Sequence, residues 1–412
     1  MFNLPFKFRD VIHDFIEFPK SPLGATALQV VQTSTYQRLR RLSQLGMAKL
    51  VYPCAEHTRF AHSLGSFHLA QKVMTLLKEK GKLSDISQAE QDATCLAALL
   101  HDVGHCMFSH ASEGMWDFRH EEQTYNLILK DIELDKVLKE YPSSSNFKQL
   151  IINILKGENL TDNKYFLHEI VSSQLDVDRM DYILRDAHMT GVKYGSYDPK
   201  WILEYLTVSE FNGKWRLVVD KKAIDAVEQY LTARYYMYRN VYEHKTSRIF
   251  EIMLQAIIKE IKNFDDEILK KHALLWMKGP DFNNLEEYKT LDDYKMWEAL
   301  KTISKEQDFT GNVKDLAVDF LYNRRWELEK NPKSNTINKG FSDGAYYTKI
   351  KPSKFYDQEP DNQVLVLLDN DSPPKLLSQI GRFISINKKR EVEERLCLKR
   401  PKLKTNADLL IY

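Results

Sequence analysis

The sequence LAALLHDVGHCMFSH, residues 96–110, is the most informative stretch of the chain. Residues 95–100 are apolar on every side, which is typical of either a buried helix or a short buried strand. Three histidines, one aspartate and one serine follow within the next ten residues. They begin with the adjacent pair His101 and Asp102. Packing alone does not explain them, because a buried ionisable group is costly unless it is paired or bound to a metal. We therefore interpret this stretch as the centre of an active site.

The composition excludes several classes of protein. Hydrophobic residues make up 43% of the chain and charged residues 28%, as in ordinary globular proteins. A formal charge of +1 gives no global field for nucleic acid or an anionic membrane, so an anionic ligand must be held locally. The four cysteines show no CxxC spacing, which favours free thiols in a reducing compartment. Charged residues interrupt the apolar residues at the amino terminus too soon for a signal peptide. No run of the chain approaches the roughly 20 apolar residues of a membrane span. We expect a cytoplasmic protein without a membrane segment.

The periodicity of the chain predicts a mainly α-helical protein with a few short strands and a hairpin. Strands are expected within residues 6–18. Asn212-Gly213, between alternating apolar residues, predicts a hairpin with a type I′ turn. A helix is expected at residues 25–45, where Gly46 would end it, and another follows the loop at 51–65 and runs to about residue 80. Further helices are expected at residues 88–100, in several pieces within 120–192, and as one or two helices within 223–262.

The last third of the chain predicts a smaller lobe. Residues 265–330 are charged and amphipathic, and we expect them to be helical. A loop at 335–344 and strand-like runs at 345–351, 363–368 and 382–386 follow. With 412 residues, the chain exceeds the usual size of one compact domain. We therefore predict a helical core over residues 1–263 and a C-terminal α+β lobe over residues 264–412.

Three separated places offer ligands that a divalent metal accepts: His62, the pair His101 and Asp102, and the acidic run at residues 175–187. In isolation, the acidic run is equally compatible with a solvated, salt-bridged helix, and a lone histidine is more often an ordinary one. The joint occurrence of the three places favours a site. Spacings of three and four residues place the polar members of the run on one helix face, namely Asp178, Asp181, Tyr182, Arg185 and Asp186.

Four motifs together resemble the HD superfamily of metal-dependent phosphohydrolases, and within it the deoxynucleoside-triphosphate triphosphohydrolase branch. They are YPCAEHTRFAHSLG (52–65), LLHDVGHCMFSH (99–110), HEEQ (120–123) and DVDRMDYILRDA (176–187). The resemblance runs from about residue 8 to about residue 245. It implies an HD-domain helical core, and because it begins so early we expect no sterile-alpha-motif domain ahead of it.

The resemblance implies a metal centre and nearby histidines. His62, His101, Asp102 and Asp178 would bind one divalent metal, for which Mn, Fe, Mg, Zn, Ni and Co all stay open. In the family, water attacks the phosphorus attached to the sugar, so the departing 5′ oxygen needs a proton. The remaining catalytic candidates are His110 as first choice for the proton donor, His120 as second choice, Glu113 to orient His110, and His105 to contact phosphate. A hydrogen-bonded network without proton transfer is the alternative role for these histidines.

The same resemblance implies a substrate site for a deoxynucleotide. Arg59, Arg234 and Lys245 match phosphate-contacting positions. Tyr182 matches the aromatic residue that packs below the sugar and crowds out a 2′-hydroxyl. The other matches are Gln44 and Asp186, which would hold the 3′-hydroxyl, and Tyr242, which would close the pocket or pack in the core.

The sequence thus predicts an enzyme that converts deoxynucleoside triphosphates to deoxynucleosides and inorganic triphosphate. The alternatives are an HD-type phosphohydrolase for another nucleotide or phosphoester, and a nucleotide-sensing or nucleic-acid-binding protein, weakly supported by the basic runs at 388–390 and 399–404. The resemblance implies a homo-oligomer, dimer or tetramer. At an allosteric position where the vertebrate member carries an aspartate that reads guanine, this chain has Gln32, which lacks a carboxylate's bidentate grip. Allosteric activation by a nucleotide and the preferred base are left open.

Overall fold

The computed structural model describes residues 5–142, 146–322, 327–330, 345–350, 363–369, 372–381 and 393–398, with the backbone alone for His110 and for the strands within 327–330, 345–350 and 393–398. The described part is mainly helical, as predicted, and its buried apolar side chains form one continuous core. The loop predicted at 335–344, the strand at 382–386 and both basic runs lie outside the described residues. Of the described helices, none is both long and apolar enough to cross a bilayer.

Three helices form the centre of the molecule: α3 (Arg59–Glu79), α4 (Gln88–Leu100) and α10 (Val177–Thr190). α3 packs against both α4 and α10, while α8 (Phe147–Lys156) and α9 (Phe166–Val171) cover the other side of α4. Residues 92–100 of α4 are therefore all buried. The apolar run fitted either a buried helix or a short buried strand, and it forms the helix. The Ser87 hydroxyl and the Glu90 carboxylate cap the start of α4 reciprocally.

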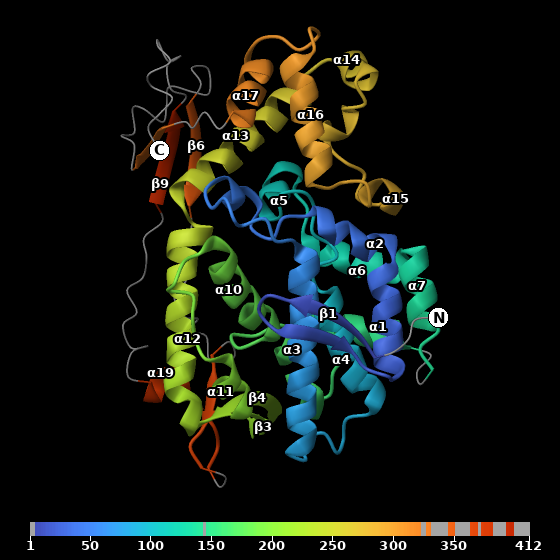
Figure 1. The fold of residues 1–412 in the computed structure, drawn as a ribbon, viewed down its shortest axis with the longest axis vertical. Helices are drawn as coiled ribbons and strands as arrows, with labels where there is room; N and C mark the ends of the chain where they lie inside the picture. Colours follow the sequence, from blue (N-terminus) through green and yellow to red (C-terminus); the bar gives the residue numbers. More distant parts are fainter. Residues whose placement is uncertain are drawn as a thin grey trace.

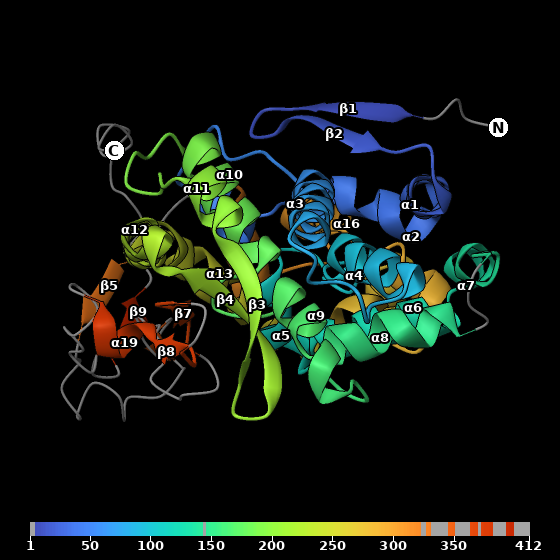
Figure 2. The same ribbon diagram turned by 90° about the horizontal axis from the view of Figure 1, so that it is seen from below.

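The predicted amino-terminal strands are present as a hairpin, β1 (Phe6–Asp10) and β2 (Asp14–Phe18). Figures 1 and 2 show this hairpin lying across α3 on the outside of the helical core. Ile16 and Phe18 of β2 are fully buried, and the Phe18 ring packs against Phe67 of α3. The hairpin is thus anchored to α3 by apolar contact.

The single helix predicted at residues 25–45 is wrong, because the chain breaks there into α1 (Pro22–Gln32), α2 (Ser34–Gln37) and the short 3-10 helix η1 (Arg38–Arg41). Thr33 is extended, and its hydroxyl accepts a hydrogen bond from the backbone N–H of Tyr36. A threonine that caps a new helix in this way ends the preceding one.

Residues 120–192 form several helices, as predicted. Gly157, with φ at 68°, ends α8. The remaining elements of residues 46–204 are η2 (Gly46–Leu50), α5 (His110–Trp116), α6 (His120–Lys130), α7 (Ile132–Lys139), η3 (Asp162–Lys164) and α11 (Pro199–Glu204).

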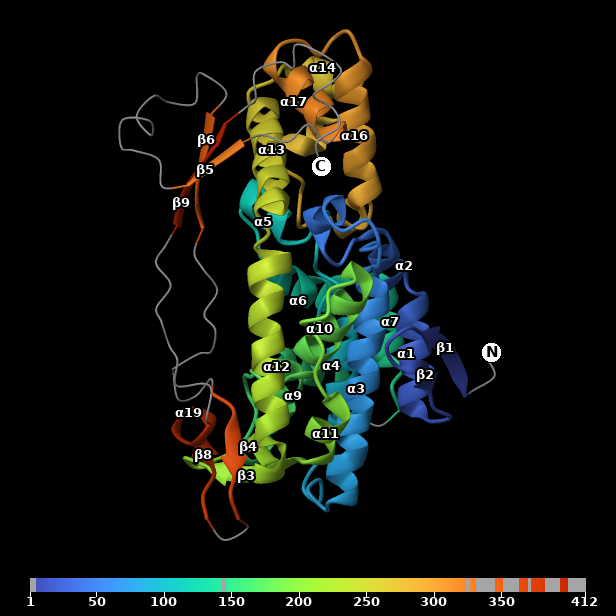
Figure 3. The ribbon, with the colours of Figure 1, turned by 60° about the vertical axis from the view of Figure 1, so that its left-hand side comes forward.

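The predicted hairpin is β3 (Leu206–Phe211) and β4 (Lys214–Asp220), and both Asn212 and Gly213 have the positive φ of a type I′ turn. After η4 (Lys221–Ala223), the region 223–262 forms two helices, α12 (Ile224–Met237) and α13 (Lys245–Lys262). A π-helical turn, η5 (Tyr238–Tyr242), joins them end to end (Figure 3). Such π turns are frequent at functional sites.

The last third contains the predicted helices and short strands. The helices are α14 (Asp266–Lys271), η6 (Leu275–Lys278), α15 (Leu285–Tyr288), α16 (Asp293–Lys305), α17 (Asn312–Leu321) and α19 (Leu377–Ile380). The strands are β5 (Glu327–Lys330), β6 (Ala345–Ile350), β7 (Leu365–Leu367), β8 (Lys375–Leu376) and β9 (Glu393–Leu398). The prediction of helix up to residue 330 is wrong at its end, because β5 pairs with β9 in a sheet of order β5-β9-β6.

The predicted lobe is joined to the core by a shared sheet. Its strand β7 pairs in parallel with β4, which gives a four-stranded sheet of order β3-β4-β7-β8. At the other end of the molecule, α17 packs on both α13 and α16 (Figures 1 and 3). The domain boundary at residue 263 stays a prediction.

Candidate metal centre and active site

The four predicted metal ligands converge from three helices. His62 lies in the first turn of α3, His101 and Asp102 directly follow α4, and Asp178 lies in the first turn of α10. His62 Nε2 is 3.0 Å from Asp178 Oδ1 and 3.3 Å from His101 Nε2. His101 Nε2 is 3.5 Å from Asp178 Oδ1 and 3.3 Å from Asp102 Oδ1, and His62 Nε2 is 3.8 Å from Asp102 Oδ2. The tertiary structure thus brings together ligand types that are remote in the chain.

Both imidazoles are oriented for metal binding. His101 Nδ1 lies 2.8 Å from the carbonyl oxygen of Ala98, which can only accept, so Nδ1 carries the proton. His62 Nδ1 lies 2.8 Å from Oδ2 of Asp181 and donates to it in the same way. In a neutral imidazole, the remaining Nε2 atom then carries a lone pair, and in both rings Nε2 faces Asp178. This donor set and its outer hydrogen bonds fit a divalent metal.

The electrostatics of the cluster lead to the same conclusion. Burial on its own would lower the pKa of His62, but hydrogen bonds and charges from Asp178 and Asp181 outweigh burial and raise this pKa to about 10. Burial would raise the pKa of Asp178, yet His101 and His62 hold it below its ordinary value. The carboxylates therefore keep the imidazole of His62 protonated in the metal-free protein. A divalent cation would take the place of this proton, so metal binding would release protons.

A second group of ligand atoms adjoins the first. Asp102, His105 and His120 have ligand atoms within 4.8 Å of one another. His105 Nε2 lies 3.3 Å from Asp102 Oδ1, and the His105 and His120 rings stack with their centroids 3.7 Å apart. Burial, reinforced by the charge of Arg59, holds the pKa of His105 well below its ordinary value. His105 is therefore neutral at neutral pH.

Glu113 contacts His120, because its Oε1 atom lies 2.5 Å from Nδ1 of that ring. Its expected role of orienting His110 stays a prediction. His120 begins α6 and Glu113 lies in the first turn of α5, so the contact joins the starts of two helices. The His110 side chain lies outside the described residues, and its predicted role stays a prediction.

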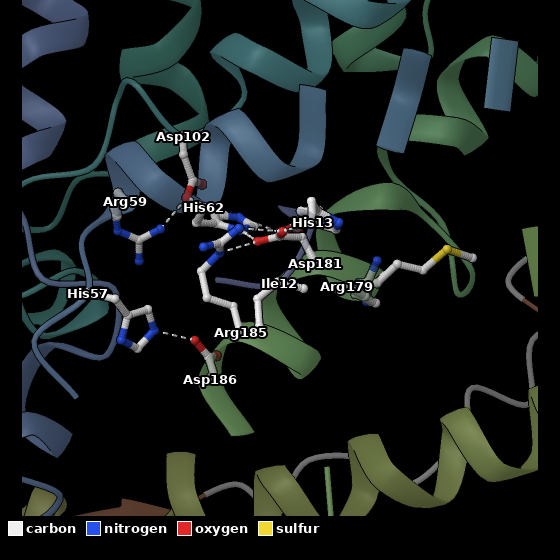
Figure 4. A network of polar contacts seen from close by, with 12 residues as sticks. Ile12, His13, His57, Arg59, His62, Asp102, Arg179, Asp181, Arg185 and Asp186 are labelled. Atoms are coloured by element: carbon white, nitrogen blue, oxygen red, sulfur yellow. Dashed lines mark hydrogen bonds and ion pairs between the residues drawn. The ribbon is translucent and has the colours of Figure 1, made fainter. Parts of the chain in front are cut away.

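Arg59, predicted to contact phosphate, is buried beside the cluster. Its Nη1 atom forms an ion pair with Oδ2 of Asp102, and its Nε–H donates to the Ser109 hydroxyl at 3.0 Å. Figure 4 shows the Arg59 guanidinium reaching Asp102 from the start of α3. The arginine neutralises and orients Asp102, and it places a positive charge next to the cluster.

The polar face of α10 is buried, so its interpretation as a solvated helix is wrong. Asp181 is fully buried, and Arg185 and Asp186 are each 1% exposed. Around Asp181 lie His62, His13 of the turn between β1 and β2, and Arg185 (Figure 4). We did not assign Asp181 or His13 a role from the sequence. The only signal was the three-residue step from Asp178 to Asp181, since nothing local indicates the hairpin contact.

Of the two residues predicted to hold the 3′-hydroxyl, Asp186 lies on the next part of α10 and Gln44 lies in the segment between η1 and η2. Asp186 Oδ1 is 2.7 Å from Nε2 of His57, a residue we did not predict, and Asp186 Oδ2 accepts a hydrogen bond from the Tyr242 hydroxyl at 2.7 Å. The backbone N–H of Gln44 donates to the carbonyl of His57 at 3.0 Å. Among the residues that the structure describes, the buried Gln44 Oε1 and His57 Nδ1 atoms have no hydrogen-bond partner. Both atoms are therefore available to hydrogen-bond with a polar ligand.

Tyr182 links this place to the metal ligands. Its ring lies edge-on to His62 and to Tyr242, with centroid distances of 6.3 and 5.9 Å. The π-helical turn η5 presents Tyr238 and Tyr242 to α10, where the Tyr182 and Tyr238 hydroxyl oxygens are 3.2 Å apart. The predicted aromatic residues Tyr182 and Tyr242 therefore connect His62 to Asp186 through successive contacts.

The predicted phosphate contacts from the end of α12 and the start of α13 are less closely placed. Arg234 donates from Nη1 to Oε1 of Gln174 at 2.5 Å, and its charge interacts with Tyr182 and Arg179. Lys245 is exposed at the start of α13, and the described contacts do not link it to the cluster. Arg179, which we did not predict, directly follows Asp178 and lines a polar cavity of about 300 Å³ together with Arg216 and Gln174.

The helical core gathers buried histidines and aspartates at helix ends, an arrangement that can hold a divalent metal. Residues 59–186 match the HD domain, and residues 206–315 match the HD associated region. The chain therefore belongs to the HD-domain phosphohydrolase family and is an enzyme, as the motifs predict. HD domains bind divalent metals, and the His and Asp clusters described above are the candidate sites in this chain.

Relatives from bacteria and eukaryotes support this assignment. The uncharacterized protein YwfO of Bacillus subtilis is 30% identical over 94% of this chain and 91% of its own length. A solved phosphohydrolase of Bacteroides thetaiotaomicron is 30% identical, with a TM-score of 0.78 that covers 96% of this chain and all of that one. The deoxynucleoside triphosphate triphosphohydrolase SAMHD1 homolog of Dictyostelium discoideum is 30% identical over 62% of this chain. That match spans about half of the Dictyostelium protein, 49% of its length.

Proposed function

We propose that this protein is a metal-dependent deoxynucleoside-triphosphate triphosphohydrolase that releases a deoxynucleoside and inorganic triphosphate. The convergence of His62, His101, Asp102 and Asp178 carries the proposal, because both histidines direct Nε2 at the same carboxylate. The relation to the SAMHD1 homolog supports this choice of substrate.

The four residues of the cluster would hold one divalent metal. When bound, such a metal polarises a phosphoryl oxygen and lowers the pKa of water. Two imidazoles and two carboxylates suit Mn, Fe, Zn, Co and Ni, and Mg accepts the carboxylates. Arg59 and Asp181 keep Asp102 and His62 in place from outside the cluster.

Hydrolysis requires a proton for the departing group. Water adds to the α-phosphorus, the bond between phosphorus and the sugar 5′ oxygen breaks, and the 5′ oxygen takes up a proton to leave as the alcohol. His120 can supply this proton, because Glu113 accepts from its Nδ1 atom and holds the ring in position. His110 at the start of α5 is the other donor that we propose.

The triphosphate and the sugar would occupy the two sides of the cluster. Arg59 and Arg234 would supply positive charge for the phosphates. Gln44 Oε1, buried and without a described partner, can accept a hydrogen bond from a sugar hydroxyl next to Asp186. The ring of Tyr182, between His62 and Tyr242, limits the space at the 2′ position. This combination favours deoxyribose.

A substrate screen with product identification tests the proposal. Protein stripped of metal and reloaded with Mn²⁺ is incubated with the four dNTPs, the four rNTPs and nucleoside monophosphates, and the phosphate products are separated by ion chromatography. We expect deoxynucleoside and intact triphosphate from the dNTPs, and no product from chelated protein. Orthophosphate or pyrophosphate would instead show another HD-type phosphohydrolase. Binding without turnover by any metal form would show a nucleotide-sensing protein.

We also propose that the enzyme is a homo-oligomer, a dimer or tetramer. The family relation to SAMHD1 proteins supports this proposal. Light scattering coupled to size-exclusion chromatography, with and without added nucleotide, measures the molar mass directly. A mass of one chain, 48.4 kDa, under every condition would contradict it.

A further inference from the structure

We infer that the amino-terminal hairpin positions the metal ligand His62. His13 of the hairpin turn holds Asp181 directly, Asp10 holds it through Arg185, and Asp181 fixes the orientation of His62. The inference rests on the proposed metal site at His62, His101, Asp102 and Asp178. It adds positioning residues from a segment that the HD domain match, residues 59–186, does not include.

The carboxylate of Asp181 lies at the centre of the arrangement, and all its partners are donors. Oδ2 accepts from His62 Nδ1 at 2.8 Å and from Arg185 Nε at 2.8 Å. Oδ1 accepts from His13 Nε2 at 2.7 Å and from Arg185 Nη2 at 2.9 Å. Asp181 is fully buried, so each donor replaces a water molecule that the carboxylate would otherwise bind.

The hairpin turn is itself held by the same network. Asp10 Oδ1 accepts from the backbone N–H groups of Ile12 and His13 at 2.9 and 3.0 Å, which shapes the turn. Asp10 Oδ2 accepts from Arg185 Nη1 at 2.8 Å, and the His13 ring packs on His68 of α3 at 4.9 Å. The turn therefore reaches α10 through the carboxylates of Asp10 and Asp181 and reaches α3 through a ring contact.

This geometry has a consequence for the ligand atom. The proton on His62 Nδ1 stays there because Asp181 accepts it, and only then is Nε2 available to a metal. Loss of His13 would leave Arg185 Nη2 as the remaining described donor to Oδ1 of Asp181, so the carboxylate would be held less firmly against His62. Outer hydrogen-bond partners of metal ligands typically change metal affinity or activity by about 10–100-fold.

The test measures Mn²⁺ binding to metal-stripped protein by the electron paramagnetic resonance signal of free Mn²⁺. We expect His13→Ala to raise the Kd by about 10–100-fold, and His13→Gln, whose amide can donate to Asp181, to recover part of the affinity. Excess Mn²⁺ should restore kcat in His13→Ala, because the missing group acts through His62. The matched control is Lys7→Ala, which breaks an exposed hairpin ion pair with Glu17 and should leave the Kd unchanged.

Each outcome is decisive. Wild-type affinity in His13→Ala would overturn the inference, whereas a wild-type protein that fails to bind Mn²⁺ would contradict the proposed metal centre itself. A purely structural role predicts a lower melting temperature with an unchanged Kd below it, and that result would also overturn the inference. If His13→Ala does not fold, the Mn²⁺ Kd of Asp10→Asn is compared with that of the wild type instead. This substitution weakens the contact between the hairpin turn and Arg185.

Discussion

The Nε2 atom of His62 lies 3.0 Å from Oδ1 of Asp178, across the contact between α3 and α10. This short separation depends on Gly65, one turn after His62, where an added Cβ would lie 1.8 Å from the Asp181 carboxylate. The glycine lets the two helices approach until their first turns share a cluster of ligand atoms. The spacing of the proposed metal ligands is therefore set by helix packing.

Replacing Asp178 with asparagine should abolish metal-dependent hydrolysis while the fold is kept. The amide is a weaker metal ligand and carries no charge to balance the cation, so we expect a loss of at least about 100-fold in kcat/KM. Metal content by mass spectrometry and steady-state rates measure the effect. Asp225→Asn, an exposed carboxylate in the first turn of α12, is the control. Full activity in Asp178→Asn would disprove the ligand assignment.

The contact between Glu113 and His120 predicts which histidine gives the proton. We expect His120→Asn to lower kcat by about 10²–10⁴-fold, in the range of a lost general acid. Glu113→Gln should lower kcat by about 10–100-fold. Combined, the two changes should cost less than the sum of their free energies, because the residues act as a unit. A larger loss in His110→Asn than in His120→Asn would assign the proton to His110 instead.

Tyr182 is predicted to decide the choice of sugar. Its ring stands between His62 and Tyr242, so Tyr182→Ala opens space beside the sugar. We expect kcat/KM for rNTPs to rise by about 10-fold relative to dNTPs, which corresponds to about 1.4 kcal/mol of discrimination. Competition assays with paired dATP and ATP measure this ratio. Tyr194→Ala, an exposed tyrosine outside α10, should leave it unchanged.

The stability of the metal-free protein should fall as the solution becomes alkaline. The pKa of His62 is raised from 6.5 to about 10, so the folded protein holds this proton more tightly than the unfolded chain does. The resulting stabilisation is fully present below pH 6.5 and is lost as the pH rises toward 10, by up to about 1.4 kcal/mol per pH unit. Urea unfolding in chelator from pH 6 to 10 tests it, with His62→Gln as the comparison. Equal slopes for both proteins would contradict the prediction.

Asp293 of α16 supports two loops of the site from the predicted C-terminal lobe. Its carboxylate accepts from the backbone N–H of Phe108 at 2.8 Å and from that of Ser43 at 3.0 Å. Asp293→Asn keeps one acceptor oxygen, so we expect about 1–3 kcal/mol of lost stability together with reduced activity. Chemical unfolding and rates measure both, and Glu298→Gln on the exposed side of α16 is the control. Activity at the wild-type level would show that these loops need no support from α16.

The amino-acid sequence by itself determined the parts of this protein that depend on local spacing. The apolar run before His101 and Asp102 is helix α4, and the residues predicted as ligands lie at the beginnings and ends of helices. The turn at Asn212-Gly213 has the predicted type, because positive φ at two successive residues favours those amino acids. Such features follow from backbone geometry within a few residues.

Only the tertiary structure decided which side chains meet. Glu113 pairs with His120 across the starts of two helices, and His13 reaches Asp181 from a hairpin remote in the chain. The burial of the α10 polar face also depends on α3 and this hairpin packing over it, whereas its sequence pattern equally fits a solvated helix. Periodicity specifies which face of an element is polar. What covers that face is decided by close packing between elements. A single glycine such as Gly65 lets two helices approach, and a single threonine cap such as Thr33 ends a helix.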